Sequence, residues 1–324
     1  MLKKLYPVAA TLVLASTASA QPAATFPTKP IRLITITAPG GSLDILARTI
    51  AQNLNEQMGQ PVVVENRTGA GGNIGAEALA RSEPDGYTIG MITSSTHGIN
   101  PSLFGASLGF DAINDFVPII RAAELNNVVV VHPSIPVKNI PELVDYARAN
   151  PGKLSFGSAG TGTTQHLAGE MFNVMTGLKM LHVPYRGAAQ AVPDLIGGQT
   201  QLMFVSIPDV IAHIRSGKLR AIGVTGPTRA DAVPDAPPVS EQGYPDFTVT
   251  AWFGVAAPAK TPKEIVDRYN QEIVKALNKP EVQEKLKGLG LTPVTSTPEA
   301  FAAFIRHDID KWAKVVKASG AKVN

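Results

Sequence analysis

Short apolar runs alternate with amphipathic helical patterns along most of this chain. Residues 30–37 (PIRLITIT) are rich in β-branched side chains and predict a strand. From Leu43 to Met58, apolar residues recur at helical spacing, and Gly59 is placed to end that helix. Further strands are expected at 61–65 and 87–93. This alternation predicts an α/β fold with a largely parallel sheet.

The same pattern restarts near residue 126 and continues for about a hundred residues. The expected strands of this second part are 126–133, 153–158, 181–185, 201–205 and 219–226. The expected helices between them are 141–150, 166–177, 188–198 and 207–217, although Pro193 must kink the third. Two α/β units in series are therefore expected.

The last quarter of the chain predicts helices. Thr261 and Glu264 have the spacing of a capping box, with Pro262 at the first helical position. Pro298 is placed to open the final helix, which has one continuous apolar face.

The N-terminus has the pattern of a cleavable secretory signal. Lys3 and Lys4 precede a short apolar run, and Ala18-Ser19-Ala20 has the small-residue spacing of a cleavage site. The apolar run is too short to cross a membrane. We therefore expect residues 1–20 to be a signal peptide, Gln21 to begin the mature chain, and the protein to be exported.

Composition narrows the chemistry further. The chain has no cysteine, which excludes a thiolate nucleophile, a thiolate metal site and a lipid anchor on cysteine. Its 29 basic residues include Lys3 and Lys4 of the expected signal and are balanced by 26 acidic residues, so no nucleic-acid partner is expected.

Two glycine-rich junctions lie where an expected strand meets an expected helix. These are residues 37–44 (TAPGGSLD) and residues 157–166 (GSAGTGTTQH). A helix start exposes unpaired backbone N–H groups at the positive end of the helix dipole. Glycine lets an anion approach that backbone closely. Two such junctions, one from each unit, could close on one small anion from opposite sides.

Known nucleotide, zinc and hydrolase motifs fit poorly. The stretch 157–164 is close to a P-loop, but Thr163 stands where the phosphate-binding lysine should be. Residues 69–75 miss the dinucleotide fingerprint at Ile74, no G-x-S-x-G motif occurs, and the histidines lack H-x-x-x-H spacing. A secreted serine hydrolase using Ser158, His166 and a distant aspartate stays open as the alternative function.

Several motifs together resemble one known family along nearly the whole expected mature chain. They include residues 26–48 (FPTKPIRLITITAPGGSLDILAR), 151–172 (PGKLSFGSAGTGTTQHLAGEMF), 182–199 (HVPYRGAAQAVPDLIGGQ) and 218–225 (KLRAIGVT). In this order they look like the substrate-binding proteins of tripartite tricarboxylate transporters, also called the Bug family.

The resemblance implies a non-catalytic periplasmic receptor with two α/β domains, a hinge and an interdomain cleft, as in Venus-flytrap binding proteins. It implies a small carboxylate ligand, a permease partner with a large and a small membrane subunit, no cofactor, no metal and a monomeric state. It also implies two crossings between domains, which we place near Asn127 and Gly243. The expected domains are then 21–127 with 244–324, and 128–243.

Under the resemblance, the two junctions become the jaws of a carboxylate pincer. The first jaw is Pro39, Gly40, Gly41 and Ser42. The second jaw is Ser158, Ala159, Gly160, Thr161, Gly162, Thr163 and Thr164. Without a ligand, either segment could simply be a tight turn.

Other candidate ligand contacts have two open roles each. Asp44 either supports the first loop or meets a hydrogen-bond donor of the ligand, and His166 is either a ligand contact or a structural imidazole. Arg186 either pairs with a second carboxylate or is solvated, and Trp252 either walls the cleft or packs in the core. Candidates for the distal end of the ligand, at the carboxyl ends of other strands, are Ser94, Ser95, Thr96 and Ser206.

Overall fold

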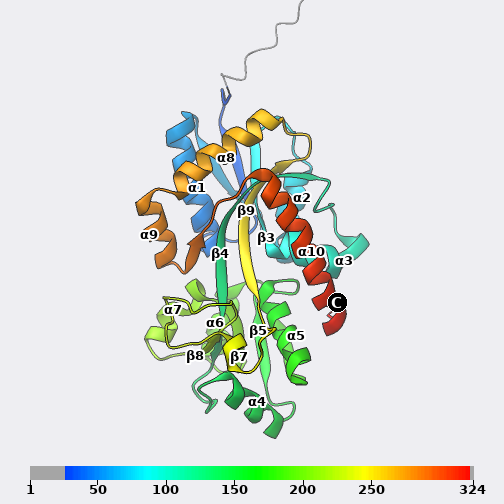
Figure 1. Ribbon diagram of the computed structural model, residues 1–324, viewed down its shortest axis with the longest axis vertical. Coiled ribbons are helices and arrows are strands. Elements are labelled where there is room, and N and C mark those ends of the chain that lie inside the picture. The colour runs from blue at the N-terminus through cyan, green and yellow to red at the C-terminus, as the bar shows by residue number, and fades with distance from the viewer. Residues whose placement is uncertain (1–25, 322–324) are drawn as a thin grey trace, which may run out of the picture.

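One long strand, β4 (Phe116–Val131), belongs to both halves of the molecule and runs between them in Figure 1. The computed structural model describes residues 26–321. Up to Asn126, β4 pairs with β9 (Thr250–Pro258); from Asn127 onward it pairs with β7 (Leu202–Ser206). The strands follow the order β2-β1-β3-β9-β4-β7-β5-β6, with β8 and β10 also paired to β4. The chain therefore forms two α/β halves that share a strand, and we call the region where they meet the join.

The first half is a sheet covered by helices on both faces. Its other strands are β1 (Ile31–Thr35), β2 (Val62–Asn66), β3 (Thr88–Thr93) and β10 (Leu291–Pro293). One face carries α1 (Ser42–Met58), α8 (Lys263–Leu277) and α9 (Pro280–Gly288). The other carries α2 (Asn73–Ala80) and α10 (Pro298–Ser319). The last helices of the chain thus return to the half built by its beginning, as Figure 1 shows.

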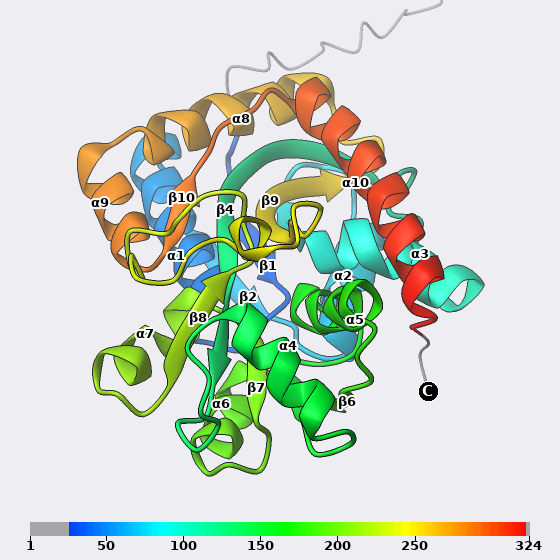
Figure 2. The same cartoon turned by 60° about the horizontal axis from the view of Figure 1, so that its bottom comes forward.

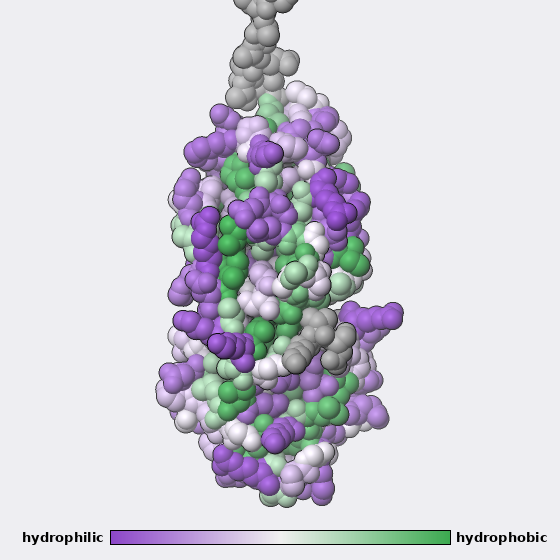
Figure 3. Space-filling view, turned by 90° about the vertical axis from the view of Figure 1, so that its right-hand side faces the viewer, coloured by the Kyte–Doolittle hydropathy of each residue, from purple (hydrophilic) through white to green (hydrophobic). Residues whose placement is uncertain are grey.

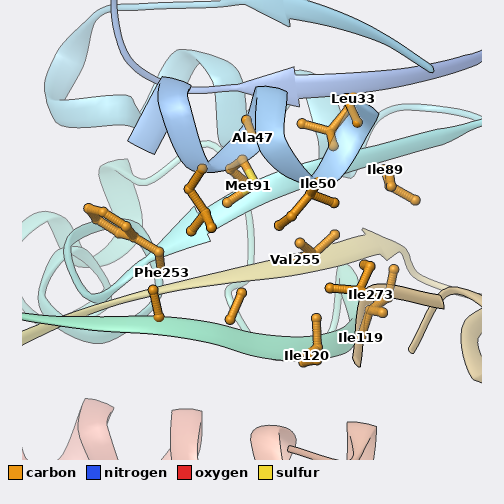
Figure 4. Close-up of a cluster of buried hydrophobic side chains, with 14 of the residues drawn as sticks. Leu33, Ala47, Ile50, Ile89, Met91, Ile119, Ile120, Phe253, Val255 and Ile273 are labelled. Carbon is orange, nitrogen blue, oxygen red and sulfur yellow. The ribbon is translucent and has the colours of Figure 1, made fainter. Parts of the chain in front are cut away.

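Alternating apolar residues explain why α1 lies on this sheet. Figure 4 shows Ala47 and Ile50 of α1 in one cluster with Leu33 of β1 and Met91 of β3, all of them fully buried. Each large aliphatic side chain buried in this way contributes about 1.5–3 kcal/mol. Gly59 ends the helix with a left-handed φ of 69°, as the sequence predicts.

The second half repeats the layered arrangement. Its strands beyond β4 are β5 (Ser155–Ser158), β6 (Leu181–Pro184), β7 and β8 (Arg220–Val224). Helices α4 (Ile140–Ala149) and α5 (Thr164–Thr176) share one core cluster, and α6 (Ala188–Ile196) and α7 (Ile207–Arg215) share another. The end of α10 crosses to this half, because Trp312 packs into the same cluster as α5. The two halves are therefore tied by β4, β9 and α10.

Short helices complete the described part of the chain. They are η2 (Ala70–Gly72), the π-helix η3 (Ser95–Ile99), α3 (Asn100–Phe104), η4 (Gly105–Ser107) and η5 (Val239–Gln242). On the side shown in Figure 3, hydrophobic residues occur in small groups between hydrophilic ones. None of the helices within residues 26–321 is long and apolar enough to cross a membrane.

Strand directions bring many loops to the join. Strand β4 enters the join from the first half, and β3 runs the same way because both are antiparallel to β9. Strands β1 and β2 are parallel to β3. In the second half, β7 and β8 run against β4 and so return to the join, and β5 and β6 are parallel to β7. The carboxyl ends of β1, β2, β3, β5, β6, β7 and β8 therefore all point to the join, where open α/β sheets bind ligands.

The structure confirms the α/β class and corrects three details. The sheet is mixed, because β4 and β9 run antiparallel to their neighbours. The strand expected at 126–133 is the end of the longer β4. The capping box is wrong: α8 begins at Lys263 without a side-chain cap, and the Thr261 hydroxyl donates to the Pro258 carbonyl instead. The division of the chain at Asn127 and Gly243 stays a prediction.

Candidate functional site

Each of the two glycine-rich loops follows a strand whose carboxyl end points to the join. The first, residues 36–41, connects β1 to α1, and the second, residues 159–163, connects β5 to α5. A Cβ added at Gly71, in the turn after β2, would lie 3.2 Å from the Thr161 carbonyl oxygen. A Cβ added at Gly162 would lie 2.5 Å from Asn100 Oδ1. Backbone of the second half is therefore in close contact with the first half at this point.

Asp44 supports the first loop. Its carboxylate is 2% exposed and accepts hydrogen bonds from the Gly40 amide at 2.9 Å, Arg48 Nε at 2.9 Å and Asn66 Nδ2 at 2.8 Å. Burial raises the pKa of Asp44, but the hydrogen bonds from Arg48, Gly40 and Asn66 outweigh it and leave the pKa below its usual value. The carboxylate is thus ionised and fully engaged, which favours the loop-supporting role over ligand contact.

The first turn of α1 retains free donors. The first helical hydrogen bond runs from the Ile45 amide to the Gly41 carbonyl, and Gly41 has no side-chain cap. Within residues 26–321, the amides of Gly41, Ser42 and Leu43 have no hydrogen-bond partner. Gly41 and Ser42 are half-buried, whereas Pro39 and Gly40 are exposed. Unpaired amides at the positive end of a 17-residue helix suit a carboxylate oxygen.

The second loop is more closed on itself than the sequence suggests. The Ala159 amide donates to Gln165 Oε1 at 2.9 Å, the Gly160 amide to Ser158 Oγ at 3.1 Å, and the Gly162 amide to His166 Nδ1 at 3.3 Å. Three amides of the predicted second jaw are therefore engaged within the segment itself, and its binding role stays a prediction.

Hydroxyls of the second loop are engaged as well. Thr163 Oγ1 donates to the Gly160 carbonyl at 2.7 Å and accepts from the His166 amide as the cap of α5. Ser158 is fully buried and its Oγ lies 2.7 Å from His182 Nε2. Among the described residues, the Thr161 amide has no partner, and the Thr164 amide begins α5 without one. These two amides are the donors that this loop offers to the join.

His166 and His182 stack beneath this loop. Their ring centroids are 4.0 Å apart with an interplanar angle of 23°. Burial lowers the pKa of His166 to about 4, and burial together with the neighbouring His166 lowers the pKa of His182 to about 3. Glu170 Oε1 lies 3.8 Å from His166 Nε2, and burial raises the pKa of Glu170. Both imidazoles are neutral near pH 7.

Three of the residues proposed for the distal end or wall of the site are buried. Ser94 is 1% exposed, and its Oγ accepts from the Trp252 amide at 3.5 Å. Thr96 is fully buried in η3 and lies 2.9 Å from His97 Nδ1. Trp252 packs in the core of the first half, where its Nε1 donates to Asp308 Oδ2 at 2.7 Å. Trp252 thus takes the core alternative, whereas ligand contact by Ser94 and Thr96 stays a prediction, because their hydroxyls are buried and bonded to neighbouring groups.

Ser95 and Ser206 are half-buried, and Arg186 is exposed. Ser206 occupies the N-cap position of α7 without a side-chain capping hydrogen bond, and its Oγ donates to Asn127 Oδ1 at 3.4 Å. Asn127 is fully buried, and its Nδ2 has no partner within the described residues. A buried amide without a partner is costly, so this donor is suited to a ligand or a water.

Sequence reasoning missed Asn127, His182 and Asp209. Asp209 lies in the first turn of α7, and burial raises its pKa to about 6. A polar residue at the end of an expected strand, as Asn127 is, was the available signal. His182 carried none, because its partner Ser158 lies 24 residues away in the sequence.

The geometry weighs against the hydrolase alternative. Ser158 pairs with His182 rather than with His166, and the acid near the pair, Glu170, faces His166. A nucleophile also has to reach its substrate, and Ser158 is fully buried. The site is built to offer hydrogen-bond donors.

Comparison with known proteins also favours a binding protein over a hydrolase. Residues 46–321 match the tripartite tricarboxylate transporter family receptor. The chain is 38% identical to protein BugT of Bordetella pertussis over 300 residues, which are 92% of each protein. The solved structure of R. palustris Rpa4515 with adipate is 34% identical, with a TM-score of 0.87 over 92% of this chain and all of that one. MatC from Rhodopseudomonas palustris with bound malate is 30% identical, with a TM-score of 0.83 over 90% of this chain and all of that one.

Proposed function

The chain belongs to the tripartite tricarboxylate transporter receptor family, the Bug proteins, and on this premise we propose that it is a periplasmic solute-binding protein for a small carboxylate. Related structures hold adipate and malate, both dicarboxylates. The ligand of this chain is then a dicarboxylate or another aliphatic or aromatic organic acid. Delivery to the membrane subunits of a tripartite tricarboxylate transporter completes the proposed role.

One observation supports this function most directly. Amides without a partner among the described residues lie at the start of α1 (Gly41, Ser42 and Leu43) and in the loop after β5 (Thr161), and both β1 and β5 end at the join. Hydrogen bonds to a charged group contribute about 1.5–3 kcal/mol each. The segments 37–44 and 157–166 contain no Arg or Lys, so one carboxylate of the ligand is held mainly by backbone donors.

The far end of the ligand meets a different set of groups. Asn127 Nδ2 and Ser206 Oγ lie at the join where β4 and β7 pair, and Ser95 is half-buried after β3. These groups are suited to a second carboxylate or a hydroxyl. Arg186 is exposed, so a direct role for it requires a ligand that reaches the rim of the join.

Thermal melting against a panel of acids tests the proposal. The panel contains adipate, malate, succinate, benzoate and, as an uncharged control, glucose. A cognate acid at a hundredfold excess over its Kd stabilises the protein by about 2.7 kcal/mol. Turnover of an ester by the same sample is measured in parallel. Failure of every acid to raise the melting temperature, or saturable ester hydrolysis, would overturn the proposed function.

A further inference from the structure

Two neutral imidazoles are built into the base of the second glycine-rich loop. His166 comes from α5 and His182 from β6, and Phe156 of β5 stacks on the His182 ring at 5.0 Å. The three rings form one layered stack, because the interplanar angles are 26° and 23°. Such a stack holds each ring nitrogen in a fixed place.

Each imidazole is tied to one side of the loop. His182 Nε2 lies 2.7 Å from Ser158 Oγ, and that oxygen lies 3.1 Å from the Gly160 amide and 3.2 Å from the Gly160 carbonyl. His166 Nδ1 accepts the Gly162 amide at 3.3 Å. The amides on both sides of Thr161 are thus taken up by groups that the two histidines hold.

The direction of the Gly162 hydrogen bond settles the His166 tautomer. A backbone N–H can only donate, so His166 Nδ1 carries a lone pair and the ring proton is on Nε2, toward Glu170. A protonated His166 would carry a hydrogen on Nδ1 as well, and this N–H would face the N–H of Gly162. The loop conformation therefore requires a neutral ring with an acceptor at the Nδ1 position.

We propose that His166 and His182 are positioning residues, which set the loop of residues 158–163 so that its Thr161 amide faces the ligand beside the Thr164 amide at the start of α5. They do this without touching the ligand. This inference rests on the proposed function and assigns a task to two side chains that the ligand contacts leave unexplained. It also explains why the free amide belongs to Thr161 and not to Gly160 or Gly162.

A metal site is the competing explanation. One nitrogen of each histidine and one Glu170 oxygen all lie within 4.8 Å of one another, and zinc accepts such ligands. A metal ion lies near the plane of each imidazole that binds it. Two nearly parallel rings stacked 4.0 Å apart cannot both point at one ion unless one ring turns, which breaks its bond to the loop. Metal binding would therefore disrupt the loop.

Paired substitutions test the proposal with the full mature chain. His166→Asn keeps an acceptor close to the Nδ1 position, and His182→Gln keeps a polar group close to Nε2. His166→Leu removes the first of these groups and His182→Leu removes the second. Val174→Ala, at a 48% exposed position on α5, is the control. Calorimetry with the acid that gives the largest melting shift measures Kd, and circular dichroism checks the fold.

We expect each Leu variant to weaken binding at least tenfold, the Asn and Gln variants to recover most of that loss, and the control to bind normally. Equal Kd values in all the variants, or equal losses in the Leu and the conservative variants, would overturn the positioning role. Micromolar zinc that changes Kd in the wild type and not in His182→Gln would also overturn it, in favour of a metal site.

Amide hydrogen exchange separates this inference from the proposed function. In the ligand-free wild type, the Gly160 and Gly162 amides should exchange slowly and the Thr161 amide fast. His166→Leu should release the Gly162 amide, and His182→Leu the Gly160 amide. Unchanged protection in these variants contradicts the inference even if no acid in the panel binds, a result that by itself contradicts only the proposed function.

Discussion

Asp44 and Asp209 are two aspartates in the first turns of helices, and their surroundings move their pKa values in opposite directions. Asp44 accepts hydrogen bonds from Gly40, Arg48 and Asn66, which lower its pKa despite burial. Burial alone raises the pKa of Asp209 to about 6. An acid in the first helical turn can therefore either stabilise the fold or be retained at a cost, and the difference lies in its partners.

Replacing Asp44 by Asn should destabilise the protein by about 2 kcal/mol at pH 7, because the charged acceptor of three hydrogen bonds is lost. An acid with a lowered pKa stabilises the fold above its unfolded pKa of about 3.9 and loses this as pH falls through the folded value. Urea unfolding at pH 7, 5 and 3 should show the difference between variant and wild type shrinking at pH 3. A difference that is constant with pH would refute the ionic role.

Replacing Asp209 by Asn should change the free energy of unfolding in the opposite direction and stabilise the protein at pH 7. The folded protein holds the Asp209 proton more tightly than the unfolded chain, so ionisation costs stability as pH rises from about 4 to about 6. The Asn variant should be more stable by about 1–2 kcal/mol above pH 6 and equal to wild type below pH 4. Urea unfolding over this range measures it. If binding of the acid also weakens, Asp209 faces the ligand; a variant less stable at pH 7 contradicts the prediction.

At the scale of elements, the start of α1 is the clearest test of backbone recognition. Gly41 has a φ of −75° and ψ of 165°, and an added Cβ meets only the Ala38 carbonyl at 3.8 Å. Gly41→Val should therefore fold normally yet crowd the free amides of Ser42 and Leu43. We expect at least a tenfold loss of affinity by calorimetry. Near-normal affinity would remove α1 from the binding site.

Gly288→Val is the matched control for this prediction. It lies at the end of α9, outside both glycine-rich loops, and has open space around its added Cβ. It should bind the acid normally. Gly160→Val is a poorer test, because Gly160 has a φ of 131° and its added Cβ would lie 3.1 Å from the Tyr185 carbonyl. Weak binding there would follow from backbone strain as readily as from a blocked ligand.

Most regular elements could be predicted from the sequence, and the exceptions have physical causes. Apolar β-branched runs identified β1, β3 and β7. The first part of β4 was missed because Pro118, Arg121 and Glu124 interrupt its apolar pattern, and β9 because Gly254 and its alanines resemble a linker. Pairing with neighbouring strands overrides these weak local preferences.

The site could be predicted in part for a similar reason. Glycine-rich junctions are local signals, so both loops were located correctly. Which amides are free depends on Asp44, His182 and Gln165, and these contacts form only in three dimensions. Of the small polar residues 93–98, Ser94 and Thr96 are buried and only Ser95 and its neighbours in η3 lie against α10, a helix about 200 residues later in the sequence. Distant partners of this kind leave no pattern in the sequence.

At the scale of the whole molecule, we expect the two chain crossings predicted near Asn127 and Gly243 to let the halves move as a hinge. Strand β4 changes partners between Asn126 and Asn127, and β9 begins at Thr250 (Figure 2 shows both strands from the second half). We expect ligand to close the halves, because the free amides come from both of them. Small-angle scattering should show a smaller radius of gyration with saturating acid. An unchanged radius in wild type, under conditions where calorimetry shows binding, would argue against closure.

Export is the second prediction at this scale. Lys3, Lys4 and the sequence Ala18-Ser19-Ala20 lie outside the described residues and have the pattern of a cleaved signal. N-terminal sequencing of protein from the periplasmic fraction should begin at Gln21 or within two residues of it. An intact Met1 in that fraction would show that residues 1–20 are retained.

The late position of β9 in the sequence has a kinetic consequence during synthesis. Gly90 of β3 pairs with Ala256 of β9, so the sheet of the first half cannot close until the whole second half has been made. At about 5–20 residues per second, those intervening residues take roughly 8–30 s to emerge from a ribosome. The second half has most of its own strands by then, but the first waits with an open sheet. The first half therefore stays unfolded while the chain is being made, and an unfolded chain is the form that can be passed through a narrow secretory channel.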